Sequence, residues 1–229
     1  MGKINKRYQF KKKFVKSIER QTVRKLMLLS KKEASDLLYN LPPLKKSDKF
    51  LEESKNLNDS FLNRGLYLNE THFPEAYMNT AIILLQTIIM TNTNAIRDGL
   101  IYPALFSFRH YLELTMKDSL NYFNNSSQVV KEVQNRDHNL NNLWKALLTY
   151  IGTGEDVEIM KKLINEVNNI DPTSETFRYP YEIDENGLKR LPHINQTRLN
   201  DVVKLKGVML KMYRFLDGVN YLAHERGGL

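Results

Sequence analysis

The sequence predicts an all-α protein, an up-and-down helical bundle that follows a basic helical extension. Apolar residues recur at spacings of three and four through most of the chain, which is the period of a buried helix face. The apolar–polar alternation that marks strands is almost absent, and strand and helix patterns do not follow one another in turn. We therefore expect an extension and connector over residues 1–70 and the helical bundle over residues 71–229.

The N-terminal extension carries the positive charge of the chain. Residues 1–49 hold 15 Lys and Arg against 4 Asp and Glu, whereas the other 180 residues hold 19 against 22. Apolar spacing predicts an amphipathic helix over residues 14–41, and such a basic helix can contact RNA, an anionic membrane or a protein partner. The alternatives are a solubilising tail and a helix that packs on its own body. The expected nucleic-acid contacts are Lys11, Lys12, Lys13, Arg20 and Arg24.

The bundle itself is expected to contain a series of helices with recognisable ends. Pro74 and Glu75 suit the first turn of a helix, and Gly152 suits the residue after a last turn. Residues 171–195 have the composition of a loop. The expected helices span residues 74–90, 94 or 103 to 123, 140–150, 155–170 and 196–224.

Composition excludes several classes of protein. The chain has no cysteine, which rules out disulfides, iron–sulfur clusters, cysteine nucleophiles and thiolate zinc sites. No apolar run approaches the ~20 residues that a membrane helix needs, and the N-terminus lacks the apolar core of a secretory signal. We expect a cytoplasmic protein with no membrane partner. A phosphate-binding loop, a dinucleotide fingerprint and a serine-hydrolase elbow are also absent, and we expect no cofactor.

The helix around residues 106–117 carries the first candidate residues. Arg109, Glu113 and Lys117 follow one another at spacings of four, so neighbours of opposite charge stack along one stripe. Such pairs contribute roughly 0.2–0.5 kcal/mol each on an exposed helix, and they become costly in the interior unless every group is satisfied. His110 could act as a general acid or base. No third ligand stands at helix spacing, so we expect no metal site.

Two further segments carry polar candidates. His138 precedes a predicted helix, where it can cap the helix, bond across a loop or titrate, and a structural role is favoured. In the loop that follows the fourth helix, Asp171 and Ser174 are expected to form turns that satisfy the loop backbone.

Arg178 stands in the same loop and has two interpretations. Its guanidinium could grip Glu113 or Glu175 as a structural clamp, which is favoured, or it could bind a phosphate.

Three of these segments, in this order, resemble the HEPN family of small helical domains. They are R-x-x-x-E-L-x-x-K at residues 109–117, H-[D/N]-L-x-x-L at residues 138–143, and R-Y-P at residues 178–180. The resemblance covers roughly residues 75–229 and implies a helical bundle, often dimeric, whose ribonuclease members cleave RNA without metal. By this resemblance the candidate catalytic residues line a polar cleft, and they are Arg109, His110, Arg178 and His224. The structural motif residues are Glu113, Lys117, His138, Asp171, Ser174 and Tyr179.

The chain departs from the ribonuclease members at one point. Those members carry an Arg followed by a His after four to six residues, and no pair here has that spacing: seven residues separate Arg64 from His72, and nine separate Arg214 from His224. This departure counts against nuclease activity. The resemblance implies a protein that binds or cleaves RNA in a bacterial defence or toxin–antitoxin setting, and it also implies a homodimer. The alternative is a non-catalytic interaction or nucleotide-sensing module that docks a protein partner through its N-terminal helix.

Overall fold

A computed structural model of the chain describes residues 72–123, 138–179 and 201–227. The chain divides into two units, residues 1–69 and 70–229, and all of the described residues belong to the second. The predicted basic helix over residues 14–41, with its five candidate RNA contacts, lies outside the described residues.

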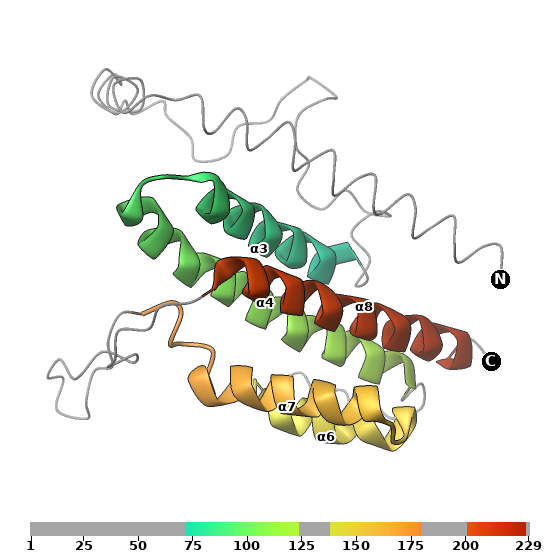
Figure 1. Ribbon diagram of the computed structural model, residues 1–229. Helices are drawn as coiled ribbons and strands as arrows, with labels where there is room; N and C mark the ends of the chain where they lie inside the picture. The colour runs from blue at the N-terminus through green and yellow to red at the C-terminus, as the bar shows by residue number, and fades with distance from the viewer. Residues whose placement is uncertain (1–71, 124–137, 180–200, 228–229) are drawn as a thin grey trace, which may run out of the picture. The chain divides into compact units, whose positions relative to one another are not determined.

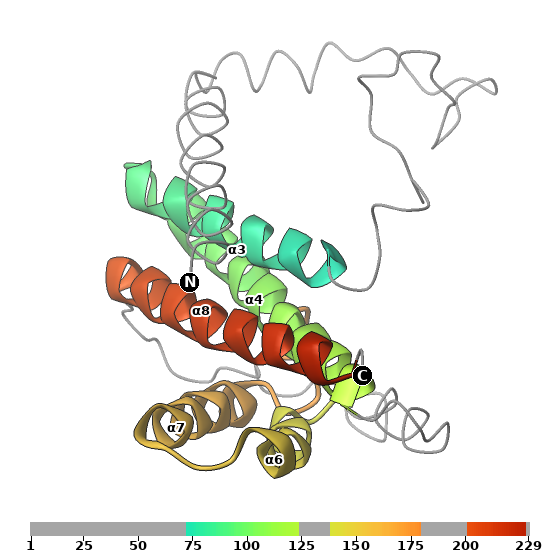
Figure 2. The same ribbon diagram turned by 90° about the vertical axis from the view of Figure 1, so that its right-hand side faces the viewer.

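The described part of the second unit is built from helices, and no strand occurs in it, which confirms the all-α prediction (Figures 1 and 2). None of its helices is long and apolar enough to cross a membrane. In chain order the helices are α3 (His72–Met90), α4 (Asn94–Phe123), α6 (Leu140–Ile151), α7 (Glu155–Ile170) and α8 (Val202–Gly227).

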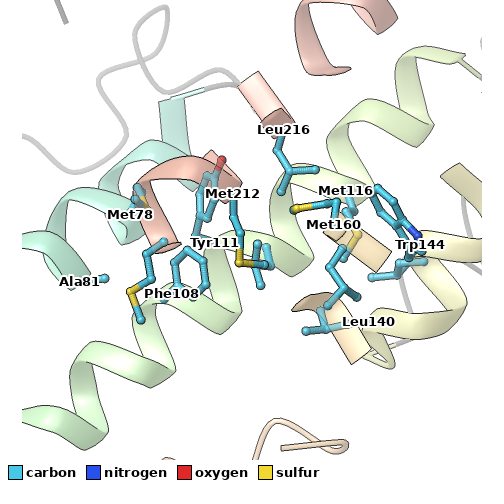
Figure 3. Close-up of a cluster of buried hydrophobic side chains, with 14 of the residues drawn as sticks. Met78, Ala81, Phe108, Tyr111, Met116, Leu140, Trp144, Met160, Met212 and Leu216 are labelled. Carbon is cyan, nitrogen blue, oxygen red and sulfur yellow. The ribbon is translucent and has the colours of Figure 1, made fainter. Parts of the chain in front are cut away.

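Helix α4 is the central helix of this unit, since it packs against α3, α6 and α8 (Figures 1 and 2). Its residues Leu112, Met116 and Leu120 are completely buried. Burying a side chain of this size contributes about 1.5–3 kcal/mol relative to leaving it in water. Figure 3 shows Met116 close to Leu216 of α8 and to Trp144 of α6, so one hydrophobic core joins the helices around α4.

The ends of α6 show how local sequence sets the helix bounds. Asn139 is the N-cap: its side-chain oxygen accepts hydrogen bonds from the backbone N–H groups of Asn141 and Asn142 at 3.0 and 3.2 Å. Gly152 follows the last turn with a φ of +75°, as the sequence predicts for a glycine in that position. The side chain of Asn168, near the end of α7, accepts the amide hydrogen of Leu140 at 2.9 Å and so ties the two helices together.

The predicted start of the last helix at residue 196 is wrong, because Asp201 still precedes the helix. The Asp201 carboxylate accepts the backbone N–H of Lys204 at 3.0 Å, which is the bond made by an N-cap residue. Apolar periodicity continues across this residue, whereas the cap decides where the helix begins.

Candidate functional site

The predicted charge stripe on α4 is buried. Arg109 has no exposed surface, and its Nη1 donates a hydrogen bond to Glu113 Oε2 at 2.9 Å. Lys117 Nζ donates to the other oxygen, Oε1, also at 2.9 Å. The spacing of four residues therefore forms both ion pairs, and it forms them in the interior, where each charge needs a partner.

Arg109 uses its remaining donors to reach two other segments. Its Nε bonds to the backbone oxygen of Asp171 at 2.9 Å and lies 3.3 Å from the Asp171 carboxylate. Its Nη2 bonds to the backbone oxygen of His138 at 2.7 Å, and His138 Nδ1 lies 2.9 Å from Glu113 Oε1. We call Arg109, Glu113, Lys117, His138 and Asp171 the buried ion network. The network joins α4 to the start of α6 and to the loop after α7.

The pKa of Glu113 shows that the network suits the charged carboxylate. Burial alone would raise this pKa, but hydrogen bonds from Lys117, His138 and Arg109 more than offset it, so that the pKa falls below its usual 4.5. Glu113 is therefore ionised at neutral pH and serves as the common acceptor of three donors.

The loop after α7 is held by the same network. The Oδ1 atom of Asp171 accepts the backbone N–H groups of Glu175 and Thr176 at 2.8 and 3.0 Å, whereas its Oδ2 atom forms the ion pair with Arg109 Nε at 3.3 Å. Ser174 has a φ of +65°, a left-handed conformation that is uncommon for residues other than glycine. The loop therefore has a tight bend immediately before Arg178.

Arg178 does not form the predicted clamp. Within the described residues it pairs with neither Glu113 nor Glu175, because Arg109, Lys117 and His138 already occupy both oxygens of Glu113. Its Nε donates instead to the backbone oxygen of Ser174 at 2.5 Å.

The guanidinium of Arg178 lies among aromatic rings. It is 5.7 Å from the ring centroid of Phe106 and 5.6 Å from that of Tyr179, both within the range of a cation–π contact. In the described part of the chain its two terminal amino groups have no hydrogen-bond partner. Arg178 is exposed, so these two groups are open to a ligand.

His110 is a second neighbour of Phe106 and extends this surface. The two rings are stacked, with centroids 5.8 Å apart and an interplanar angle of 7°, and Tyr77 meets His110 edge-on at 4.5 Å. Phe73 then contacts Tyr77 at 5.5 Å. We call this row the aromatic ribbon. Its members come from α3, α4 and the loop after α7: Phe73, Tyr77, Phe106, His110, Arg178 and Tyr179.

The pKa of His110 is lowered from its usual 6.5. Partial burial of the ring is the main cause, and it outweighs the attraction of Glu113. The imidazole is therefore neutral at pH 7, and Arg178 is the cation of the ribbon.

The four predicted catalytic residues do not line one cleft. Arg109 is completely buried, whereas His110 and Arg178 both contact Phe106. His224 lies against Tyr122, with ring centroids 3.5 Å apart and with its Nε2 buried and without a hydrogen-bond partner. Tyr122 is twelve residues beyond His110 on α4, which is about 18 Å along the helix axis.

A small cavity of about 30 Å³ lies elsewhere, between α3, α4 and α8. Its lining includes Glu75, Asp118 and Asp217, and this volume holds one or two waters. Within the described ranges no group of three or more His, Asp or Glu side chains is arranged to hold a metal ion.

Comparison of the chain with known protein families, with curated proteins and with solved structures finds no match. The resemblance to the HEPN family therefore stays a prediction that rests on the three short motifs.

Proposed function

We propose that this protein binds single-stranded RNA on the aromatic ribbon, in the bacterial defence or toxin–antitoxin setting that the HEPN resemblance implies. The observation that carries the proposal is Arg178: its guanidinium contacts two aromatic rings, and no residue that the structure describes bonds to its two terminal amino groups. A guanidinium fork matches the geometry of a phosphate, and aromatic rings stack on unpaired bases.

The exposed ends of the ribbon supply the stacking surfaces. The side chains of Phe73 and Tyr179 are 47% and 54% exposed, so their rings are accessible to a ligand. Stacking on an aromatic side chain contributes about 1–3 kcal/mol per base and tolerates any sequence. RNA in a duplex keeps its bases stacked on each other, so the ribbon favours single strands.

Binding without cleavage is the better supported form of the activity. Metal-independent cleavage needs a proton acceptor and a proton donor beside the phosphate, and His110 is the only histidine or carboxylic acid among the six residues of the ribbon. Arg109, which was expected to line the polar cleft, has its donors occupied by Glu113, Asp171 and His138.

The charge of the ribbon predicts how binding depends on salt. The logarithm of the binding constant falls linearly with the logarithm of the salt concentration. For a single strand, each phosphate contact made by a cation adds about −0.7 to the slope of that line. With one free guanidinium, the ribbon alone gives a slope near that value. A steeper slope in the full chain would come from the +11 balance of residues 1–49.

The test is fluorescence anisotropy with the full chain and a labelled, unstructured 12-mer RNA, beside the same RNA in a duplex. Arg178→Ala and Phe106→Ala are each expected to weaken single-strand binding about tenfold, which corresponds to ~1.4 kcal/mol. The matched control is Arg226→Ala, which removes another exposed arginine, on α8, and is expected to change affinity less than twofold.

Two results would overturn the proposal. One is equal loss of affinity in the Arg178 and Arg226 variants, which would leave only non-specific attraction to positive charge. The other is tighter binding of the duplex than of the single strand. Incubation of the labelled RNA in EDTA, analysed on a gel, checks that the strand remains intact.

A further inference from the structure

We propose that Arg109 and Asp171 are positioning residues: they act through the loop after α7 to hold the guanidinium of Arg178 in its place on the aromatic ribbon. The importance of this for RNA rests on the proposed function, whereas the positioning itself can be tested without RNA.

The first step is the anchor. Arg109 and Asp171 have no exposed surface, and Arg109 Nε contacts both the backbone oxygen and the carboxylate of Asp171. Two contacts to one residue fix both its position and its orientation. The start of the loop is thereby attached to the middle of α4.

The second step is the bend. The fixed Asp171 carboxylate accepts the N–H groups of Glu175 and Thr176, and these bonds draw the loop back over its own start. Ser174 lies inside this turn with its φ of +65°, and its side chain is buried. Its backbone oxygen receives the Nε hydrogen of Arg178, so the bend sets where the guanidinium lies.

The third step is the contact of Arg178 with α4. The guanidinium of Arg178 rests over Phe106, and Phe106 stands one turn before Arg109 on α4. The chain of contacts from Arg109 through Asp171, Ser174 and Arg178 thus returns to the helix from which it started. A guanidinium held in this way loses little freedom when it binds a phosphate, which is the physical meaning of preorganisation.

The buried ion network contains a member that allows a sharp comparison. Lys117 bonds to the same Glu113 as Arg109 does, whereas Asp171 bonds both to Arg109 and to the amides of the loop after α7. If the network only supports the fold, Asp171→Asn and Lys117→Gln should affect Arg178 alike. If the network positions Arg178, only Asp171→Asn should change the environment of Arg178.

The first measurement follows the Nε–H signal of Arg178 by arginine-selective NMR, with no RNA present. In the wild type we expect slow exchange with water and an upfield shift from the rings of Phe106 and Tyr179. Asp171→Asn keeps an oxygen for the two loop amides but puts an NH2 donor in place of the oxygen that pairs with Arg109 Nε, so the anchor is weakened and the Nε–H of Arg178 should exchange faster with water. Lys117→Gln should keep the wild-type signal.

A second variant covers the case in which Asp171→Asn does not fold. Glu175→Pro leaves every charge of the network in place, but it removes one amide donor to Asp171 and disfavours the left-handed conformation of the preceding Ser174. The Nε–H of Arg178 should again exchange rapidly with water. The positioning role would be overturned if either folded loop variant kept the wild-type signal. It would also be overturned if the Nε–H of Arg178 exchanged as fast in Lys117→Gln as in the loop variants.

The RNA measurement is a double-mutant cycle between Asp171→Asn and Arg178→Ala. If Asp171 acts through Arg178, the double variant should bind RNA as weakly as Arg178→Ala alone, whereas Lys117→Gln should leave affinity within twofold. Fully additive losses would contradict the inference. If the wild type binds no RNA, the proposed function fails, and the NMR comparison still decides whether Arg178 is positioned.

Discussion

Arg109 and His110 are neighbours in the sequence and have opposite environments in the structure. Arg109 is completely buried and bonded to three segments, whereas the half-buried ring of His110 lies on the surface, stacked on Phe106. Successive residues of a helix point about 100° apart, so α4 can hold the fold together with one residue and present a ligand surface with the next.

Removing the charge of Arg109 should strongly destabilise the protein. In Arg109→Met the buried Asp171 carboxylate loses its ion-pair partner, and the buried Glu113 carboxylate loses one of its three donors. Breaking a buried ion pair in this way costs about 3–5 kcal/mol. The free energy of unfolding from urea denaturation measures the loss. The control Lys162→Ala removes an exposed ion pair with Glu166 and should change the free energy of unfolding by less than about 0.5 kcal/mol.

Acid should weaken the fold through Glu113. Its pKa is below 4.5 in the folded state, so its contribution to stability is complete above pH 4.5 and is lost as the pH falls through the folded-state pKa. Urea denaturation between pH 7 and pH 3 should show this decline. In Glu113→Gln, which cannot titrate, the decline should be shallower. An equally steep decline in both proteins would assign the acid sensitivity to other carboxylates.

His110 should titrate below its usual value. Since burial of the ring lowers the pKa, the proton-dependent chemical shifts of His110 in NMR should have a midpoint under pH 6.5. Phe106→Ala removes the stacked ring and lets water in, so the midpoint should rise toward 6.5. A wild-type midpoint above 6.5 would mean that the attraction of Glu113 outweighs burial.

Two glycines should respond to alanine in opposite directions. Gly152 has a φ of +75° with open space around it, so Gly152→Ala should cost about 1–3 kcal/mol through backbone strain alone. Gly99 lies inside α4 with equally open space, and Gly99→Ala should gain up to about 1 kcal/mol from higher helix propensity. Thermal denaturation of both variants should show a lower melting temperature for Gly152→Ala and a higher one for Gly99→Ala. Equal effects would show that φ does not decide the outcome.

The helices could be predicted because their signals are local. Apolar spacing, Gly152 as a terminator and the four-residue spacing of Arg109 and Glu113 each act within a few residues. The start of α8 was missed, since periodicity runs past Asp201 and only the cap interrupts it. The four-residue spacing also could not decide whether the stripe is exposed, because burial depends on the segments that pack over it.

The candidate site was harder to predict, since its contacts join residues far apart in the chain. Arg109 meets Asp171 across 62 positions, and this pairing leaves Arg178 free of the carboxylates that the sequence offered as its partners. A usable signal for the ribbon was the four-residue spacing of Phe106 and His110, which places two rings on one side of α4. The contact of Tyr77 of α3 with His110 could not be predicted, since none of the three sequence motifs includes a residue of α3.

The bond between Asn168 and the amide of Leu140 has a consequence for how the chain folds. It joins positions 28 apart, whereas the bond of Asn220 to Asp118 joins α8 to α4 across 102 positions. Closing the shorter loop costs less entropy, so the α6–α7 pair should form before α8 docks. During synthesis on a ribosome, this pair would emerge and close first, and the last helix would complete the core.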